Sequence, residues 1–147
     1  MSEKIITKNR KASHEYHLFE VFEAGLELSG TEVKSLRNGK ANIADGWVDI
    51  STGEAFLRDV SISPYSHGNV RNHLEKRPRK LLLKKAELFK LQKKIEERGM
   101  SIIPLSMYFK QSWAKVEIAV AKGKKLYDKR DSDKEKTAQR QMQRAMR

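Results

Sequence analysis

Apolar residues alternate with polar ones along much of the first 120 positions, as expected for strands with one buried face. Segments with this pattern, or with a short aromatic and branched run, lie at 16–22, 26–28, 47–50, 55–57, 60–62, 103–109 and 116–120. Short turns at 51–54 and 110–112 join neighbouring segments. We therefore expect about six short strands paired antiparallel.

Two segments carry the helical period instead. Ser29 and Glu32 have the spacing of a capping box, and Gly39 is a natural end for a short helix. A longer helix is expected from about residue 84 to 98, with an apolar stripe formed by Leu88, Leu91 and Ile95. Strands and helices do not alternate regularly, which disfavours a doubly wound parallel sheet. The pattern predicts a mainly β fold: an OB-fold-like closed antiparallel barrel with two or three peripheral α-helices.

Three segments lack such periodicity. Residues 1 to about 13 are expected to form a short flexible lead, and 64–79 an exposed basic loop. From position 123 the chain carries nine basic and four acidic side chains but few apolar ones, so it cannot offset its own ordering entropy. We expect a body over residues 1–122 and a flexible basic C-terminal tail over 123–147, disordered until it meets a partner.

The charge of the chain indicates its kind of partner. The 147 residues include 31 Lys and Arg against 19 Asp and Glu, a formal net charge of +12, which favours nucleic acid over an anionic membrane. No segment approaches the roughly 20 apolar residues of a membrane span, and no apolar stretch follows the charged N-terminus as in a signal sequence. Cysteine is absent, which excludes disulfides and thiolate sites. We expect a cytoplasmic protein without a membrane partner.

Candidate RNA-binding residues gather at both ends of the expected body. Asn9, Arg10, Lys11, His14 and Tyr16 combine an amide, cations and rings, a set typical of looped or single-stranded RNA sites. The alternative for Tyr16 is an ordinary core position.

At the other end, Gly123, Lys124 and Lys125 place two ammonium groups where phosphates could bind. Their spacing is not that of a nucleotide-binding loop, so an NTPase is not expected.

Signals for catalysis are weak. Asp45, Asp49 and Asp59 are read as solvated charges rather than as a nuclease metal site. The histidines at 14, 17, 67 and 73 lack the spacing of zinc ligands. We therefore predict no enzyme activity, no metal and no cofactor.

The tail has a helical spacing of its own. Lys136, Arg140 and Arg144 lie four residues apart and would form one basic stripe. A helix of this length is marginal in water, so we expect it to form only in an anionic channel. The alternative is a disordered tail that serves solubility alone.

A set of longer motifs occurs along the whole chain in a fixed order. They are Asn9-Arg10-Lys11-Ala12, His14-Glu15-Tyr16, Phe22-Glu23-Ala24-Gly25, and the segments 30–37, 79–83, 115–125 and 128–130. With these motifs the chain resembles the SmpB family, the SsrA-binding proteins of bacteria.

The resemblance implies an OB-fold barrel that binds the tRNA-like domain of transfer-messenger RNA and brings it to stalled ribosomes. Elongation factor Tu and alanyl-tRNA synthetase would be partners indirectly, through the RNA. The tail would enter the decoding centre, contact small-subunit RNA and lie as a helix in the empty message channel. The protein itself would catalyse nothing.

The resemblance also implies roles for individual residues. Asn9, His14, Glu23, Leu82 and Lys115 would lie on the RNA face, and Lys84 beside them. For Glu23 the alternative is a strand-edge charge, and for Leu82 it is a core position. Tyr127, Asp128, Lys129 and Arg130 would act in the decoding centre. The competing interpretation is a general OB-fold translation or single-strand RNA-binding protein.

Overall fold

The computed structural model describes residues 3–65 and 72–124, which form nine strands and three helices. In chain order these are β1 (Glu3–Lys8), α1 (Ala12–Glu15), β2 (Tyr16–Leu26), α2 (Gly30–Arg37), β3 (Ala41–Asn42), β4 (Trp47–Ser51), β5 (Glu54–Arg58), β6 (Ser61–Ile62), β7 (Arg79–Leu82), α3 (Lys85–Glu96), β8 (Met100–Lys110) and β9 (Trp113–Gly123). Within this part of the chain the strands outnumber the predicted six, because β1, β3 and β7 were not foreseen.

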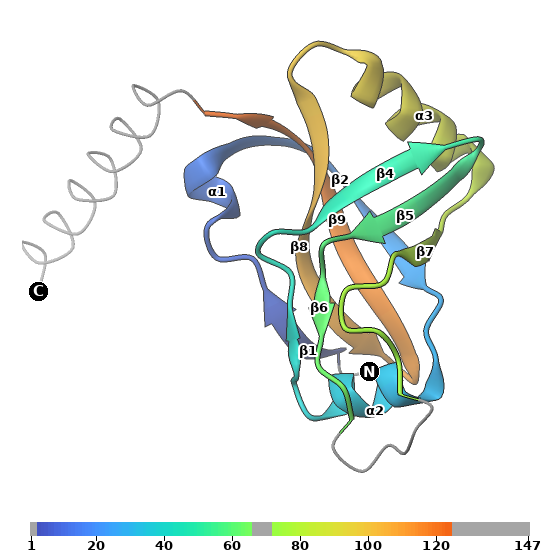
Figure 1. The fold of residues 1–147 in the computed structure, drawn as a ribbon. Coiled ribbons are helices and arrows are strands. Elements are labelled where there is room, and N and C mark those ends of the chain that lie inside the picture. Colours follow the sequence, from blue (N-terminus) through green and yellow to red (C-terminus); the bar gives the residue numbers. More distant parts are fainter. Residues whose placement is uncertain (1–2, 66–71, 125–147) are drawn as a thin grey trace, which may run out of the picture.

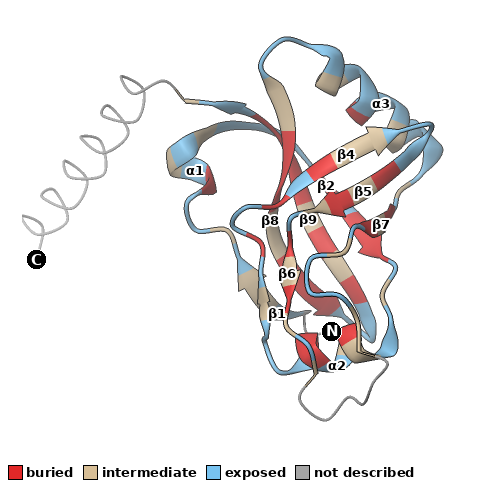
Figure 2. Ribbon diagram, in the orientation of Figure 1, coloured by how far each residue is buried: buried red, intermediate tan, exposed pale blue. Residues whose placement is uncertain are grey.

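Seven strands form one antiparallel sheet in the order β1-β8-β9-β2-β7-β5-β4, and β3 pairs with β6 separately. The sheet curls so that β4 lies against β8, and the core fills the space it encloses (Figure 2). α2 lies at one end of this body and α3 near the other (Figure 1). The predicted mainly β, OB-fold-like body with peripheral helices is confirmed.

The β8–β9 hairpin shows how the alternating pattern builds this body. Phe109 lies opposite Ala114, and Met107 opposite Val116; all four are buried. The positions between them, Tyr108 and Lys115, lie on the opposite face of the hairpin, since side chains on a strand alternate between the two faces. Gln111 adopts a positive φ of 60° in the tight turn. The predicted antiparallel hairpin is therefore confirmed.

Both predicted helices are present. The Ser29 amide donates to the Glu32 carboxylate at 2.9 Å, which closes the expected capping box of α2, and Gly39 follows with φ 69°. α3 begins after Lys84, and its Leu91 is fully buried in the core. The apolar stripe read from the sequence is the face of α3 that packs on the sheet.

The N-terminal lead is not a free segment, and that prediction was wrong for residues 3–8. β1 pairs with β8, with Ile5 opposite Tyr108, and Ile6 packs on the core. The charged residues around this short apolar pair hide the strand from a pattern analysis. Its stability comes from the ladder with β8, a contact about a hundred positions away in sequence.

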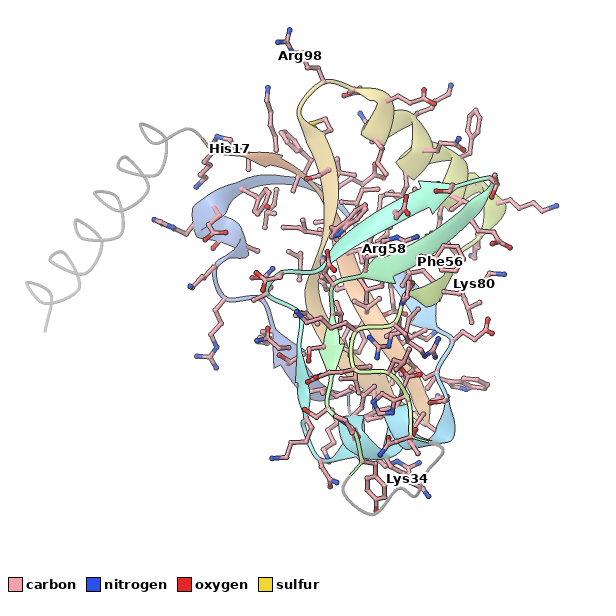
Figure 3. The ribbon with its side chains drawn as sticks, viewed as in Figure 1. His17, Lys34, Phe56, Arg58, Lys80 and Arg98 are labelled. Atoms are coloured by element: carbon pink, nitrogen blue, oxygen red, sulfur yellow. The ribbon has the colours of Figure 1, made fainter. Side chains whose placement is uncertain are left out.

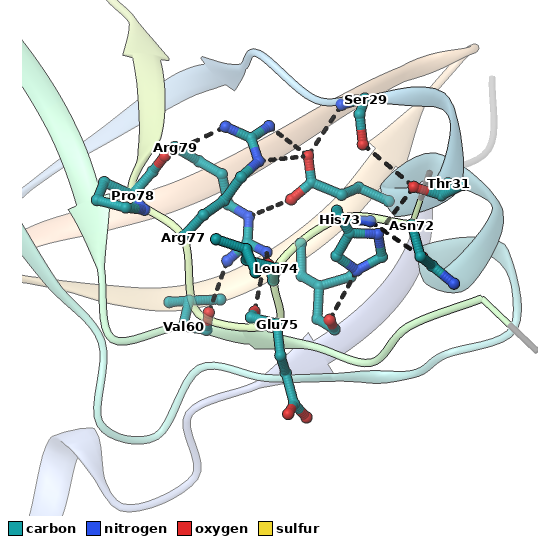
Figure 4. A network of polar contacts seen from close by, with 12 residues as sticks. Ser29, Thr31, Val60, Asn72, His73, Leu74, Glu75, Arg77, Pro78 and Arg79 are labelled. Carbon is teal, nitrogen blue, oxygen red and sulfur yellow. Dashed lines mark hydrogen bonds and ion pairs between the residues drawn. The ribbon is translucent and has the colours of Figure 1, made fainter. Parts of the chain in front are cut away.

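The prediction of an exposed basic loop at 64–79 was wrong at its C-terminal end. Arg79 is completely buried, and its Nε donates to Oε2 of Glu32 at 2.5 Å. The other guanidinium nitrogens of Arg79 donate to the carbonyls of Val60 at 2.6 Å and Glu75 at 2.9 Å. Arg77 donates to the second oxygen of Glu32 (Figure 4). These bonds satisfy a buried charge that would otherwise be very costly.

His73 fastens the same segment to α2 and β6. One of its ring nitrogens lies 2.9 Å from the Thr31 hydroxyl, and the other lies 2.8 Å from the Ile62 carbonyl (Figure 4). Residues 72–79 are thus tied to the body at several points. Their basic side chains do not form one solvated surface.

Candidate nucleic-acid interface

A groove of about 800 Å³ runs along the outer side of the sheet. It is lined by residues of β2, β5, β7, β9 and α3 and of the turns beside them: Glu23, Gly25, Gly53, Glu54, Ala55, Lys80, Leu81, Leu82, Leu83, Lys84, Lys85, Glu87, Leu88 and Lys115. Four residues of the sequence-predicted RNA face come together here, namely Glu23, Leu82, Lys84 and Lys115. Lys80 and Lys85 add two cations that the sequence analysis did not include.

Strand register sets the floor of this groove. Gly25 of β2 lies opposite Lys115 on β9 and opposite Leu82 on β7. A methyl group at Gly25 would come within 3.3 Å of the Leu82 Cβ, so the absent side chain keeps this crossing open. The aliphatic side chain of Leu82 and the ammonium group of Lys115 therefore lie on either side of the bare backbone at Gly25.

Leu82 is 51% exposed, whereas its neighbour Leu81 is buried in the core. The core alternative for Leu82 does not describe this structure. An aliphatic side chain half in solvent at the floor of a groove can pack against a flat ring. Lys80 lies two positions before Leu82 on β7, and Lys80 and its strand partner Phe56 project from β7 and β5 (Figure 3).

Glu23 is held by a tyrosine that the sequence analysis missed. The Tyr108 hydroxyl donates to Oε2 of Glu23 at 2.5 Å, and Nζ of Lys110 lies 3.7 Å from Oε1. The Tyr108 hydrogen bond lowers the pKa of Glu23, slight burial opposes this, and Lys110 and Lys115 lower it further. Glu23 therefore remains an ionised acceptor at neutral pH, fixed in direction. Period-2 alternation was the available signal, since it places Tyr108 on the outer face of β8.

A second cluster of predicted RNA residues surrounds α1. The backbone amide of Asn9 donates to the Leu105 carbonyl at 2.7 Å, and its side-chain amide donates to the Pro104 carbonyl at 3.2 Å. Arg10 and Lys11 are exposed, and His14 is half-buried. Asn9 thus fastens the turn before α1 to β8, while its two neighbours remain open to solvent.

Tyr16 is half-buried and packs on a small satellite core formed by Ala12, Ile103 and Ala121. Tyr16 also lines a hollow of about 410 Å³ together with Asn9 and Trp47. This hollow shares no residue with the groove. The structure thus divides the predicted RNA face into a groove cluster and an α1 cluster.

Lys124 closes the body against α1. Gly123 pairs with Tyr16, and the Lys124 amide donates to the Glu15 carbonyl at 2.8 Å. Its Nζ donates to the Ser13 carbonyl at 2.9 Å. Lys124 therefore satisfies carbonyls at the end of a short helix, a role that favours a cation. Residues 125–147 lie outside the described part of the chain, and with them Lys125, Tyr127, Asp128, Lys129, Arg130, Lys136, Arg140 and Arg144.

Two of the three aspartates considered for metal binding have other partners. Oδ2 of Asp49 lies 2.7 Å from Nε of Arg58, and Asp59 accepts from the Trp47 indole at 2.7 Å. Over residues 3–65 and 72–124 no group of three or more His, Cys, Asp or Glu side chains has metal-binding geometry. Nor does any helix in these ranges have the length and apolarity to cross a membrane.

A curled antiparallel sheet carrying a lysine-lined groove is typical of OB-fold nucleic-acid-binding proteins. The SmpB protein family model matches residues 6–147. The SsrA-binding protein of Desulforudis audaxviator is 54% identical over 99% of this chain and 95% of its own length. That of Geobacter sulfurreducens is 53% identical over 100% and 96%, respectively. The chain belongs to the SmpB family.

A solved structure described as "tmRNA-SmpB: a journey to the center of the bacterial ribosome" contains a chain with the same fold. Its TM-score to this structure is 0.69 at 43% sequence identity, and the match covers 82% of this chain and 85% of the other. The curled sheet described above is therefore the fold of a solved SmpB chain.

Proposed function

We propose that this protein binds the tRNA-like domain of SsrA RNA, the transfer-messenger RNA, and delivers it to stalled ribosomes for rescue and peptide tagging. The observation that carries the proposal is the groove, which gathers Glu23, Leu82, Lys84 and Lys115 from three strands and the start of a helix. Membership in the SmpB family over residues 6–147 supports the identity of the RNA.

The groove chemistry suits a structured RNA. Lysines contact phosphates without reading sequence, and Leu82 offers an apolar surface to a base. The anchored Glu23 carboxylate can accept a hydrogen bond from a base amine or a 2′-hydroxyl, which a phosphate-binding surface alone cannot do. The α1 cluster, with Asn9, Arg10, Lys11, His14 and Tyr16, would add a second contact at the opposite end of β2.

The tail would act on the ribosome rather than in RNA binding. In this proposal residues 1–122 form the binding body, and residues from 123 enter the decoding centre and the empty message channel. Lys124 keeps the start of this segment beside α1 through its bond to Ser13. Elongation factor Tu and alanyl-tRNA synthetase would act through the RNA, in the cytoplasm, and the protein itself would have no catalytic role.

A truncation after Lys124 separates the two activities, because the described core lies entirely before that point. Affinity for the tRNA-like fragment should change little, while tagging on stalled ribosomes should be lost. The logarithm of affinity should fall linearly with the logarithm of salt concentration, with a slope of about −0.7 to −0.9 per phosphate contact.

A general single-strand RNA-binding protein would give the opposite result. Its affinity would fall on tail removal, and it would not prefer the tRNA-like fragment over an unstructured RNA of equal length. Either outcome would contradict the proposal.

A further inference from the structure

The tip of the β8–β9 hairpin carries an exposed tryptophan, Trp113, which does not line the groove. Trp113 is 70% exposed, more than Phe89 at 60%, Phe19 at 54% or Trp47 at 41%. An indole is a large apolar ring with a single N–H donor, and burying its face against another group gives a large favourable free energy. Its place on the sheet indicates what covers it.

Strand periodicity puts Trp113 on the face of the sheet that bears the groove. Ala114 and Val116 point into the core, so Trp113 and Lys115 share the outer face, about 7 Å apart along the strand. Across the hairpin, Trp113 lies directly opposite Lys110, whose ammonium group pairs with Glu23. The indole therefore continues the surface that holds Lys115 and Glu23.

Basic side chains lie near the hairpin tip on both faces of the sheet. Lys4 and Arg37 line a hollow of about 330 Å³ together with Gln111 and Ser112 of the turn. On the outer face itself, Lys110 lies opposite Trp113 and Lys115 lies two positions along the same strand, so two basic side chains flank the exposed ring. Interleaved aromatic rings and basic side chains are the pattern by which proteins hold unpaired nucleotides, with the base on the ring and the phosphates on the cations.

We propose that Trp113 is a stacking platform for an unpaired base of the RNA that occupies the groove. This inference rests on the proposed function and adds a residue to its site. The indole would cover one face of a loop nucleotide, and Lys110 and Lys115 would approach the adjoining phosphates. A protein partner fits less well, because the core of a protein interface is depleted of lysine.

Substitutions at the exposed ring test the proposal without disturbing the core. Trp113→Ala should weaken binding of the tRNA-like fragment about 5- to 150-fold, the range for loss of one stacked base. Trp113→Phe should remain within about threefold of the parent, because a ring is kept. The salt dependence should be unchanged in both, since no charge is removed. Phe89→Ala, on the outer face of α3, is the matched control and should leave affinity unchanged.

Fluorescence provides a second measurement that does not depend on a destabilised variant. The chain has two tryptophans, so Trp47→Phe leaves Trp113 as the sole tryptophan, whose emission can be excited selectively at wavelengths that tyrosine does not absorb. Saturation with the tRNA-like fragment should quench its emission and protect it from acrylamide.

The outcomes separate this inference from the proposed function. If the parent protein does not bind the fragment, the proposed function fails and the inference fails with it. If the parent binds but Trp113→Ala binds equally well and the emission of Trp113 does not change, only the stacking role is overturned. Normal RNA affinity combined with reduced tagging would assign Trp113 to a ribosomal surface, which also overturns the stacking role.

Discussion

Glu32 and Glu23 are both carboxylates among basic side chains, but they lie in very different surroundings. Glu32 is fully buried and accepts four hydrogen bonds, from the Ser29 amide, Arg77 twice and Arg79. Three of these bonds reach Oε1 and one reaches Oε2, and because the side chain is fully buried no ligand can reach the carboxylate. The Glu23 side chain is 38% exposed and is held by Tyr108 and Lys110 at the edge of a groove.

A carboxylate with basic neighbours can therefore stabilise the fold where it is buried, or be available to a ligand where it is exposed. In the buried cluster the Glu32 carboxylate is bound only by donors of the protein itself, so removing a member of this cluster should change the free energy of unfolding. In the open cluster the cations and the remaining carboxylate positions face solvent, so their removal should affect binding. Substitutions in each cluster should therefore change one property and spare the other.

The largest effect is expected from Arg79→Met, which leaves Glu32 without its buried partner. Breaking a buried ion pair in this way typically costs about 3–5 kcal/mol of unfolding free energy. Chemical denaturation measures it directly. The matched control is Lys80→Met at the next position, whose exposed ion pair with Glu54 at 3.5 Å should contribute less than about 1 kcal/mol. Equal stabilities for the two variants would contradict a structural role for the buried cluster.

Acid should weaken the buried cluster in a defined direction. Burial alone would raise the pKa of Glu32, but the bonds from Arg77, the Ser29 amide and Arg79 outweigh burial and lower it below 4.5. The folded state thus binds its proton less readily than the unfolded chain, so this stabilisation is complete above pH 4.5 and is lost as the pH falls through the folded pKa.

Denaturation at a series of pH values should show this loss in the parent protein. The acid dependence should be smaller in Glu32→Gln, which has no carboxyl to protonate at that position. An identical dependence in both proteins would mean that Glu32 is not the group responsible.

In the open cluster, Lys115→Met should weaken RNA binding by about 1.5–3 kcal/mol, the value of a hydrogen bond to a charged group. It should also reduce the salt dependence by about 0.7–0.9, the slope of a single phosphate contact. Unfolding should be nearly unchanged, because Lys115 lies on the outer face. Lys93→Met removes the same charge from α3, where Nζ lies over the Phe89 ring. A similar loss in both variants would indicate a diffuse effect of charge.

A smaller effect is expected from Tyr108→Phe, which removes the donor that fixes Glu23. RNA affinity should fall by about 1 kcal/mol, or roughly fivefold. The pKa of Glu23 should rise toward 4.5, which carboxyl-carbon NMR can follow. In a double-mutant cycle with Glu23→Gln the two losses should not add, because both act through one hydrogen bond. Fully additive losses would show that Tyr108 acts independently of Glu23.

The hairpin and both main helices could be predicted from the sequence because their signals are local. Alternation along 103–109 and 116–120, and the Ser29 and Glu32 spacing, need no knowledge of distant partners. β1 and Arg79 were missed for the opposite reason. The burial of Arg79 depends on Glu32, 47 positions earlier, and a basic residue directly after a proline otherwise indicates a loop.

Part of the candidate site could also be predicted, but from the family resemblance and not from local patterns. Resemblance to a family supplied Glu23, Leu82, Lys84 and Lys115, and the structure places all four in one groove. It could not supply Tyr108, because pairing of Tyr108 with Glu23 depends on the register of β8, β9 and β2 together. Nor could it show that Asn9 and Lys124 are fastened to backbone carbonyls of the body.

The most direct test of this division is NMR mapping of backbone and side-chain shifts during titration with the tRNA-like domain of SsrA RNA. We predict that perturbations concentrate at Glu23, Leu82 and Lys115, while Glu32 and Arg79 keep their free-state shifts. Perturbations centred on α2 and the start of β7, with the groove unchanged, would contradict the account.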